Sequence, residues 1–103
     1  MVEATNLTIK DCGSSAISNG EDTTRGLKGI TKVDGLTTEN CGSNNIVAEA
    51  GKVEITNAKL GLTKSNNVKT SGDAEISLVK SEINGSTGSY GVIAEGGKIN
   101  LTD

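Results

Sequence analysis

The sequence lacks several residue types on which globular cores and enzyme sites commonly depend. Its 103 residues include no His, Phe, Trp or Pro, and only one Tyr, one Met and two Cys. Without His, the nucleophilic triads that use an imidazole base are excluded. The core must be built from Val, Ile, Leu and Ala. Because Gly, Asn, Ser and Thr are abundant, this composition favours many thin layers over one thick core.

Charge and hydropathy exclude two classes of partner. The formal net charge is −3, with both signs interleaved, so no basic patch points to nucleic acid or to an anionic membrane. No apolar run approaches the roughly 18 residues of a membrane span. Residues 1–11 have neither the basic start nor the apolar stretch of a signal peptide, so we expect any export signal to lie outside this chain.

Glycine-led strand patterns recur along the chain. Residues 51–56, 72–77 and 97–102 read GKVEIT, GDAEIS and GKINLT, in each case glycine, polar, apolar, polar, apolar, hydroxyl. Strict alternation of this kind indicates half-buried strands. Repetition of the pattern at intervals of roughly 20 to 25 residues indicates a solenoid.

A second repeat lies nearer the N-terminus and has a longer spacing. LTIKDCGSS at 7–15 matches LTTENCGSN at 36–44. Between them, residues 19–29 read NGEDTTRGLKG, a polar, glycine-rich stretch that predicts a loop inserted at a corner, and this insertion accounts for the longer spacing. Short strand-like pieces at 15–18, 45–49, 67–70 and 90–94 complete the repeats, so each repeat would contain three short strands.

These repeats predict an all-β fold, a right-handed parallel β-helix of about four to five rungs in one segment over residues 1–103. A unit of about 21 to 29 residues fits three short strands with corners, whereas a sandwich would show turns about every 8 to 12 residues. The right hand follows from the preference of parallel crossovers. The residues expected to point inward are Val53, Ile55, Leu60, Leu62, Ala74, Ile76, Val79, Ile83, Ile99 and Leu101.

Cys12 and Cys41 occupy equivalent positions in neighbouring repeats. Stacking would separate their Cα atoms by about the 4.8 Å rung spacing, which a disulfide accepts. Two interpretations therefore stay open: a disulfide, or two stacked reduced thiols. A metal pair is disfavoured because the chain has only two sulfurs and no His. No metal or other cofactor is predicted.

The outward side of the glycine-led strands carries carboxylates. Aligned by the glycines, Glu54 and Glu75 would stack as a like-charge column that Asn100 continues, with Glu3 on the same face. Lys52 and Lys98 would flank this column. A catalytic carboxyl pair would need one member in an apolar cleft, and nothing near these positions supplies one, so no catalysis is predicted.

Threonine and asparagine give two further expectations. Thr5, Thr56 and Thr102 would share one file with Ser77 between them, whereas an ice-binding solenoid would need two parallel files. Asn tolerates the left-handed backbone that tight corners require. The residues expected at corners are Asn6, Asn40, Asn44, Asn45, Asn57, Asn66, Asn67 and Asn84.

The phrases GKVEITNAKL, GVIAEGGKINLTD and SNNIVAEAGKVEIT resemble the passenger region of bacterial autotransporter adhesins. The resemblance covers most of residues 30–103. It implies a right-handed β-helix stalk on a surface-displayed or secreted protein, with adhesion or scaffolding as its role. This chain departs from a complete member by lacking the export signal and the C-terminal membrane barrel, so we expect a segment of a longer passenger.

We therefore expect a structural or adhesive segment of an extracellular or cell-surface bacterial β-solenoid, without catalysis. The expected partner is a host-cell or matrix protein or a glycan, and self-association through the solenoid ends is a further expectation. The alternatives are a polysaccharide-binding or processing β-helix and, third, an ice-binding solenoid. Inserted loops on solenoids often carry binding, so the candidate contact residues are Asn19, Glu21, Asp22 and Arg25.

Overall fold

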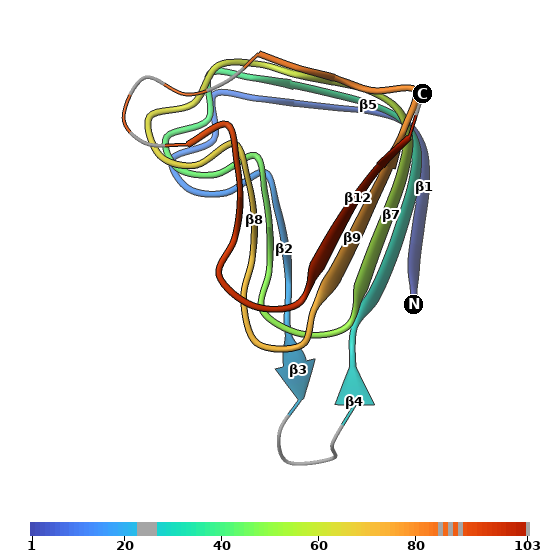
Figure 1. Ribbon diagram of the computed structural model, residues 1–103. Coiled ribbons are helices and arrows are strands. Elements are labelled where there is room, and N and C mark those ends of the chain that lie inside the picture. Colours follow the sequence, from blue (N-terminus) through green and yellow to red (C-terminus); the bar gives the residue numbers. More distant parts are fainter. Residues whose placement is uncertain (23–26, 85, 87, 89, 103) are drawn as a thin grey trace.

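Short parallel strands stack into a solenoid with three walls (Figure 1). The computed structural model describes residues 1–22, 27–84, 86, 88 and 90–102. Its strands are β1 (Val2–Lys10), β2 (Ile17–Asn19), β3 (Glu21–Asp22), β4 (Leu27–Lys28), β5 (Ile30–Glu39), β6 (Ile46–Ala48), β7 (Lys52–Leu60), β8 (Val68–Thr70), β9 (Glu75–Val79), β10 (Glu82–Ile83), β11 (Val92–Ala94) and β12 (Lys98–Thr102). Within these described ranges there is no helix long and apolar enough to cross a bilayer.

Two parallel sheets carry the stack. The larger sheet has the order β1-β5-β7-β9-β12, with β10 beside β7, and the smaller has the order β11-β8-β6-β2. Every pairing within these two sheets is parallel. The predicted all-β, parallel β-solenoid is therefore confirmed.

The larger sheet bends at a column of residues whose backbone has a left-handed conformation, with positive φ. Asn6, Gly35, Asn57 and Lys80 follow register-matched positions of successive strands, and their φ angles are 54°, 83°, 58° and 52°. Asn and Gly adopt this conformation most readily, which confirms the corner role predicted for Asn6 and Asn57. The corner divides the sheet into wall one (residues 2–5, 30–34, 52–56, 75–79 and 98–102) and wall two (7–10, 36–39, 58–60 and 82–83). The smaller sheet is wall three.

Aliphatic side chains from the three walls fill the interior. As predicted, Val53, Ile55, Leu60, Ala74 and Ile76 are at most 1% exposed. Burying a Val, Leu or Ile side chain is worth about 1.5 to 3 kcal/mol, so neighbouring rungs stabilise one another mainly through this core. Wall three contributes Ile17, Ile46, Ala48 and Val68 to the same cluster.

Two predicted core residues lie outside the core, and a third points inward but is exposed. Leu62 is 50% exposed, because β7 ends at Leu60 and the turn at Gly61 interrupts the alternation of the strand. Val79 lies half-buried in an outward column opposite Thr56, since Leu78 takes the inward position. Leu101 points inward but is 58% exposed at the end of the stack.

In wall one, the residues that pair on neighbouring strands are not the ones that aligning the glycines predicted. The sheet pairs Lys52 with Glu75 and Glu75 with Lys98, so the two steps along the chain are equal. Four residues, 71–74, connect β8 to β9, whereas three residues, 49–51, connect β6 to β7. Ala74 thereby takes the place of the strand-leading glycine, and its carbonyl accepts a 2.9 Å hydrogen bond from the Lys98 amide.

Because the error is two residues, Ala74, Glu75, Ile76 and Ser77 stay on their predicted faces of the sheet. What changes is the set of residues that lie opposite one another on neighbouring rungs.

Two buried asparagines seal the corner between walls two and three. The side chains of Asn45 and Asn67 are 1% and 0% exposed. Asn45 Nδ2 donates to Asn67 Oδ1 at 2.8 Å, and both amides donate to the Gly61 carbonyl, at 2.7 and 2.9 Å. A buried carbonyl left without a donor is costly, so these amides stabilise the turn at Gly61.

The stretch predicted as an inserted loop, residues 19–29, contains an antiparallel ribbon. Strands β3 and β4 pair Glu21 with Lys28 and Asp22 with Leu27, and the Gly29 amide donates to the Gly20 carbonyl at 2.9 Å. The ribbon projects from the corner between walls three and one (Figure 1). It is the part of the described chain that departs from the parallel stack.

Candidate functional site

The outward side chains of wall one form a continuous surface, which we call the outer face. It consists of three columns that cross the rungs: Ile30, Lys52, Glu75 and Lys98; Glu3, Lys32, Glu54, Ser77 and Asn100; and Thr5, Asp34, Thr56, Val79 and Thr102. Five strands contribute to this one wall, so the columns present regularly spaced polar groups at about the 4.8 Å rung repeat.

Charges of opposite sign alternate across the rungs of the outer face. The prediction that Glu54 and Glu75 stack was wrong, because Glu54 lies opposite Ser77 and Glu75 lies opposite Lys52. Two ion pairs result, Lys32–Glu54 and Lys52–Glu75, each with an N···O distance of 3.8 Å. These side chains are 30% to 57% exposed, so each pair contributes about 0 to 1 kcal/mol. The ion pairs fix the pattern of charge that the face presents to solvent.

The threonine file is interrupted. Thr5, Thr56 and Thr102 do lie in one column, but Asp34 and Val79 occupy the rungs between them. The expectation that Ser77 belongs to this column was wrong, because Ser77 lies opposite Glu54 and Asn100. The outer face therefore alternates hydroxyl with carboxylate and aliphatic groups along this column.

A shallow hollow lies at the edge of the outer face nearest the ribbon. It has a volume of about 290 Å³ and is lined by Ile30, Gly51, Lys52, Asp73 and Glu75. Ile30 is 39% exposed, so the hollow combines an apolar side chain with one ammonium and two carboxylates. Such a set can pack against one side of a polar ligand and bond its hydroxyl or amide groups.

Sequence reasoning missed this hollow. Asp73 lies in the corner that the glycine alignment misplaced, and Ile30 directly follows the insertion. Both positions depend on how the corners fold.

The predicted contact loop divides into parts with different roles. Asn19 is 5% exposed, and its Nδ2 donates to the carbonyls of Ala50 at 2.7 Å and Gly29 at 2.9 Å, while its Oδ1 accepts from the Thr31 hydroxyl at 2.8 Å. These bonds close the base of the ribbon, so the described contacts of Asn19 are structural. Glu21 and Asp22 lie on β3, and Arg25 lies outside the described residues. A contact role for the ribbon stays a prediction.

Cys12 and Cys41 are joined by a disulfide, with their Cα atoms 4.6 Å apart. The sequence left open a disulfide or two stacked reduced thiols, and the structure contains the disulfide. The bond links the first repeat to the second across 29 residues of sequence, and Cys41 is 3% exposed. It ties the N-terminal rung, whose strand β1 is largely exposed, to the buried stack.

Among the described residues, no three His, Cys, Asp or Glu side chains gather as the ligands of a metal ion would. Comparison of the chain with protein-family models, with curated proteins and with solved structures found no match.

Proposed function

We propose that this chain is a structural and adhesive segment of a bacterial surface or secreted β-solenoid, similar to an autotransporter passenger, and that it has no catalytic activity. The observation that carries the proposal is the outer face. It is a solvent-facing wall on which every rung carries at least one charged side chain and most rungs carry a hydroxyl group. Such a face suits contact with an extended surface, a host-cell or matrix protein or a glycan.

The disulfide supports an extracellular location. Disulfides persist in oxidising compartments and are rare in the reducing bacterial cytosol. A bond between Cys12 and Cys41 that secures the first rung suits a stalk outside the cell.

Adhesion can be tested with a pair of charge-swap variants. The double substitution K32E/E54K keeps an ion pair between the same two positions but reverses the charge pattern of the outer face. The matched control K10E/E39K makes the same exchange on wall two, where Lys10 and Glu39 pair at 3.3 Å. Each variant retains opposite charges at its own two positions, and the like charges that K32E/E54K brings together beside Glu3 are exposed to solvent, so both should fold with near wild-type stability.

The measurement is attachment of protein-coated beads to cultured host cells, immobilised matrix proteins and a glycan array. We expect the wild-type chain to attach, K10E/E39K to attach equally, and K32E/E54K to lose most of its attachment. Absence of wild-type attachment to every surface would contradict an adhesive role. Equal attachment of both variants would show that the outer face is not the contact surface.

Polysaccharide binding is the second candidate, and the hollow beside the ribbon favours it. Asp73, Glu75 and Lys52 line the hollow together with Ile30, a set of side chains that can bond sugar hydroxyls beside an apolar contact. The test is the same glycan array with D73N, compared with E82Q on wall two as a control. Glycan binding that D73N removes and E82Q leaves intact supports this candidate, and binding unaffected by D73N excludes the hollow.

A further inference from the structure

Asn19 is followed directly by Gly20, and this pair of residues can modify itself chemically. The backbone nitrogen of Gly20 attacks the side-chain carbonyl carbon Cγ of Asn19, ammonia leaves, and a cyclic succinimide forms. Water then opens the ring at either of its carbonyls, which gives aspartate or isoaspartate. Glycine favours this reaction, because it has no side chain to hinder the nitrogen and its backbone is conformationally free. The sequence contains a second such pair, Asn84–Gly85.

The folded chain holds the Asn19 side chain in hydrogen bonds that oppose this reaction. The residue is 5% exposed. Its Nδ2 donates to the Ala50 and Gly29 carbonyls at 2.7 and 2.9 Å, and its Oδ1 accepts from the Thr31 hydroxyl at 2.8 Å. We call Asn19 and these three partners the amide cluster. The attack needs a carboxamide that can turn toward the Gly20 nitrogen, and the three bonds fix its orientation.

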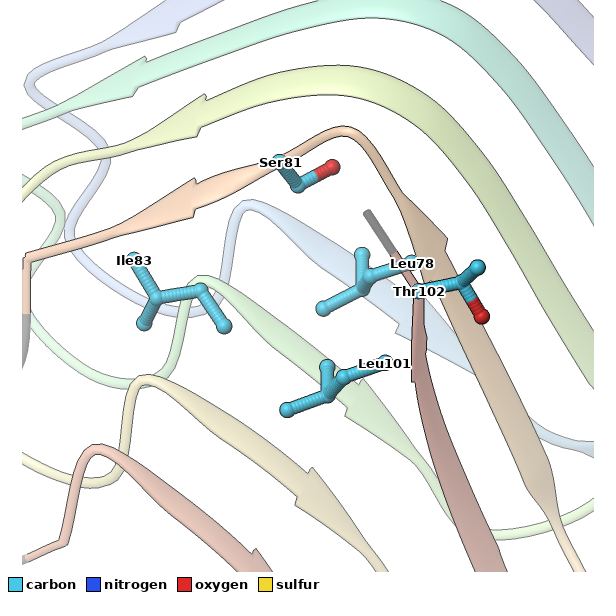
Figure 2. A pocket seen from close by; sticks show the side chains of 5 residues that line it. All are labelled: Leu78, Ser81, Ile83, Leu101 and Thr102. Atoms are coloured by element: carbon cyan, nitrogen blue, oxygen red, sulfur yellow. The ribbon is translucent and has the colours of Figure 1, made fainter.

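Thr31 is an unusual residue for its position in the fold. It points into the interior from wall one, in the column that contains Val53. Throughout the described strands of this wall the other inward side chains are aliphatic, as Leu78 and Leu101 illustrate in Figure 2. The bond from the Thr31 hydroxyl to Asn19 Oδ1 explains why a polar group stands here, because that oxygen is buried with the rest of the amide.

A carboxylate cannot replace the amide in the cluster. An ionised carboxyl group accepts hydrogen bonds but donates none. At position 19 it would therefore face the carbonyl oxygens of Ala50 and Gly29 with no hydrogen to offer them, and a buried charge without donors is unfavourable. Isoaspartate in addition lengthens the main chain by one carbon. Either product separates the groups that Asn19 holds together.

We propose that Asn19–Gly20 is a deamidation site that the amide cluster keeps inactive while the base of the ribbon is closed. Segments with few buried contacts open locally at low free-energy cost, and each opening frees the Asn19 carboxamide to react. Because the product cannot rebuild the cluster, a transient opening becomes permanent. The modification needs only water, so it succeeds or fails independently of adhesion.

Opening the base of the ribbon also alters the hollow beside it. The Gly29 carbonyl accepts a 3.0 Å hydrogen bond from the Lys52 amide, and Gly51 lies so close to that carbonyl that an added Cβ would collide with it. Gly51, Lys52 and Ile30, the residue after Gly29, all line the hollow. Deamidation of Asn19 therefore removes the support of one side of this hollow.

The first test compares deamidation of Asn19 in the folded and the unfolded chain. The protein is incubated for several weeks at physiological temperature and pH, with and without guanidinium chloride. Peptide mapping by mass spectrometry then measures the fraction of Asn19 in which a hydroxyl has replaced the amide nitrogen. We expect Asn19 to react at least about tenfold more slowly in the folded chain, because three hydrogen bonds must break first. Equal rates in the two conditions would overturn the proposal.

A pair of threonine variants tests the role of the cluster. T31V removes the hydroxyl that bonds Asn19 and places a valine beside Val53, so it should fold. T37V makes the same exchange on the same strand, where Thr37 is exposed and lies outside the cluster. In the folded chain, Asn19 should react about two- to tenfold faster in T31V, the effect of losing one net hydrogen bond, and no faster in T37V. The rate at Asn84 should stay the same in both.

The variant N19D reproduces one product of the reaction and tests its effect on the fold. Hydrogen exchange should accelerate at the Gly29 and Lys52 amides, which bond the Gly20 and Gly29 carbonyls at 2.9 and 3.0 Å. The Gly61 amide, which bonds the Thr38 carbonyl, should exchange as in the wild-type chain.

Three results from the variants would overturn the proposal. T31V without effect on Asn19 would show that the cluster does not protect it. An equal rise at Asn84 in T31V would show that the whole chain opens and not the ribbon base. Wild-type exchange at the Gly29 amide in N19D would show that the product leaves the base closed.

Discussion

Reducing the Cys12–Cys41 disulfide should destabilise the whole chain and loosen its first rung most. The bond closes a loop of 29 residues, and the chain-entropy relation gives about 3.6 kcal/mol at 25 °C for a loop of that length. Small domains are stable by about 5 to 15 kcal/mol, so this loss is a large share of the total. The first rung is affected most because, among the described strands, β1 pairs with β5 alone, whereas β7 pairs with strands on both sides.

Urea denaturation followed by far-ultraviolet circular dichroism measures the effect. The wild-type chain is compared with and without a phosphine reductant, and C12S/C41A serves as a control that the reductant should not change. We expect the free energy of unfolding to fall by about 3 to 4 kcal/mol on reduction. Hydrogen exchange should accelerate over residues 2–10 more than over 52–60. A loss no larger than that of an ordinary surface substitution, about 0.5 kcal/mol, or uniform acceleration along the chain, would refute this reasoning.

Three further substitutions test the packing, the corners and the register. Ile55→Ala should cost about 2 to 5 kcal/mol in urea denaturation, because its side chain is 1% exposed in the central rung, whereas Glu54→Ala on the outer face should cost less than about 1 kcal/mol. Gly51→Ala should lower the melting temperature by several degrees, since Gly51 has φ +75° and an added Cβ would collide with a backbone carbonyl, while Gly13→Ala, with open space around it, should not. Lys32→Glu alone should destabilise the chain by up to about 1 kcal/mol at low salt, and adding Glu54→Lys should restore part of the loss, because the introduced carboxylate still lies beside Glu3; a double variant no more stable than the single one would contradict the pairing.

The sequence predicted the fold because local pattern and tertiary structure agree in a solenoid. Alternation in 52–56 and 98–102 assigned the inward and outward faces, and the matched Cys12 and Cys41 placed two rungs side by side. The predicted asparagine corners at Asn6 and Asn57 were correct for the same reason, since a left-handed residue is chosen locally.

Corner lengths could not be predicted, because they depend on backbone geometry. Glycine marks the start of a strand at Gly51 and Gly97, but at the intervening rung Gly72 belongs to a longer turn and Ala74 takes the equivalent place. That one difference moved Glu75 from beside Glu54 to beside Lys52, and so replaced a like-charge column by ion pairs. The hollow beside the ribbon could not be predicted either, because its lining residues come from three separate segments and no sequence pattern shows that they meet.

The register of the stacked rungs is most directly measured by scalar couplings across backbone hydrogen bonds in a long-range HNCO experiment. The Glu75 amide should correlate with the Gly51 carbonyl and the Lys98 amide with the Ala74 carbonyl, since both bonds are 2.9 Å long. These two correlations would establish parallel rungs with equal steps along the chain. Correlations from Asp73 to Gly51 and from Lys98 to Gly72, the partners that the glycine alignment gives, would contradict the register and the charge pattern built on it.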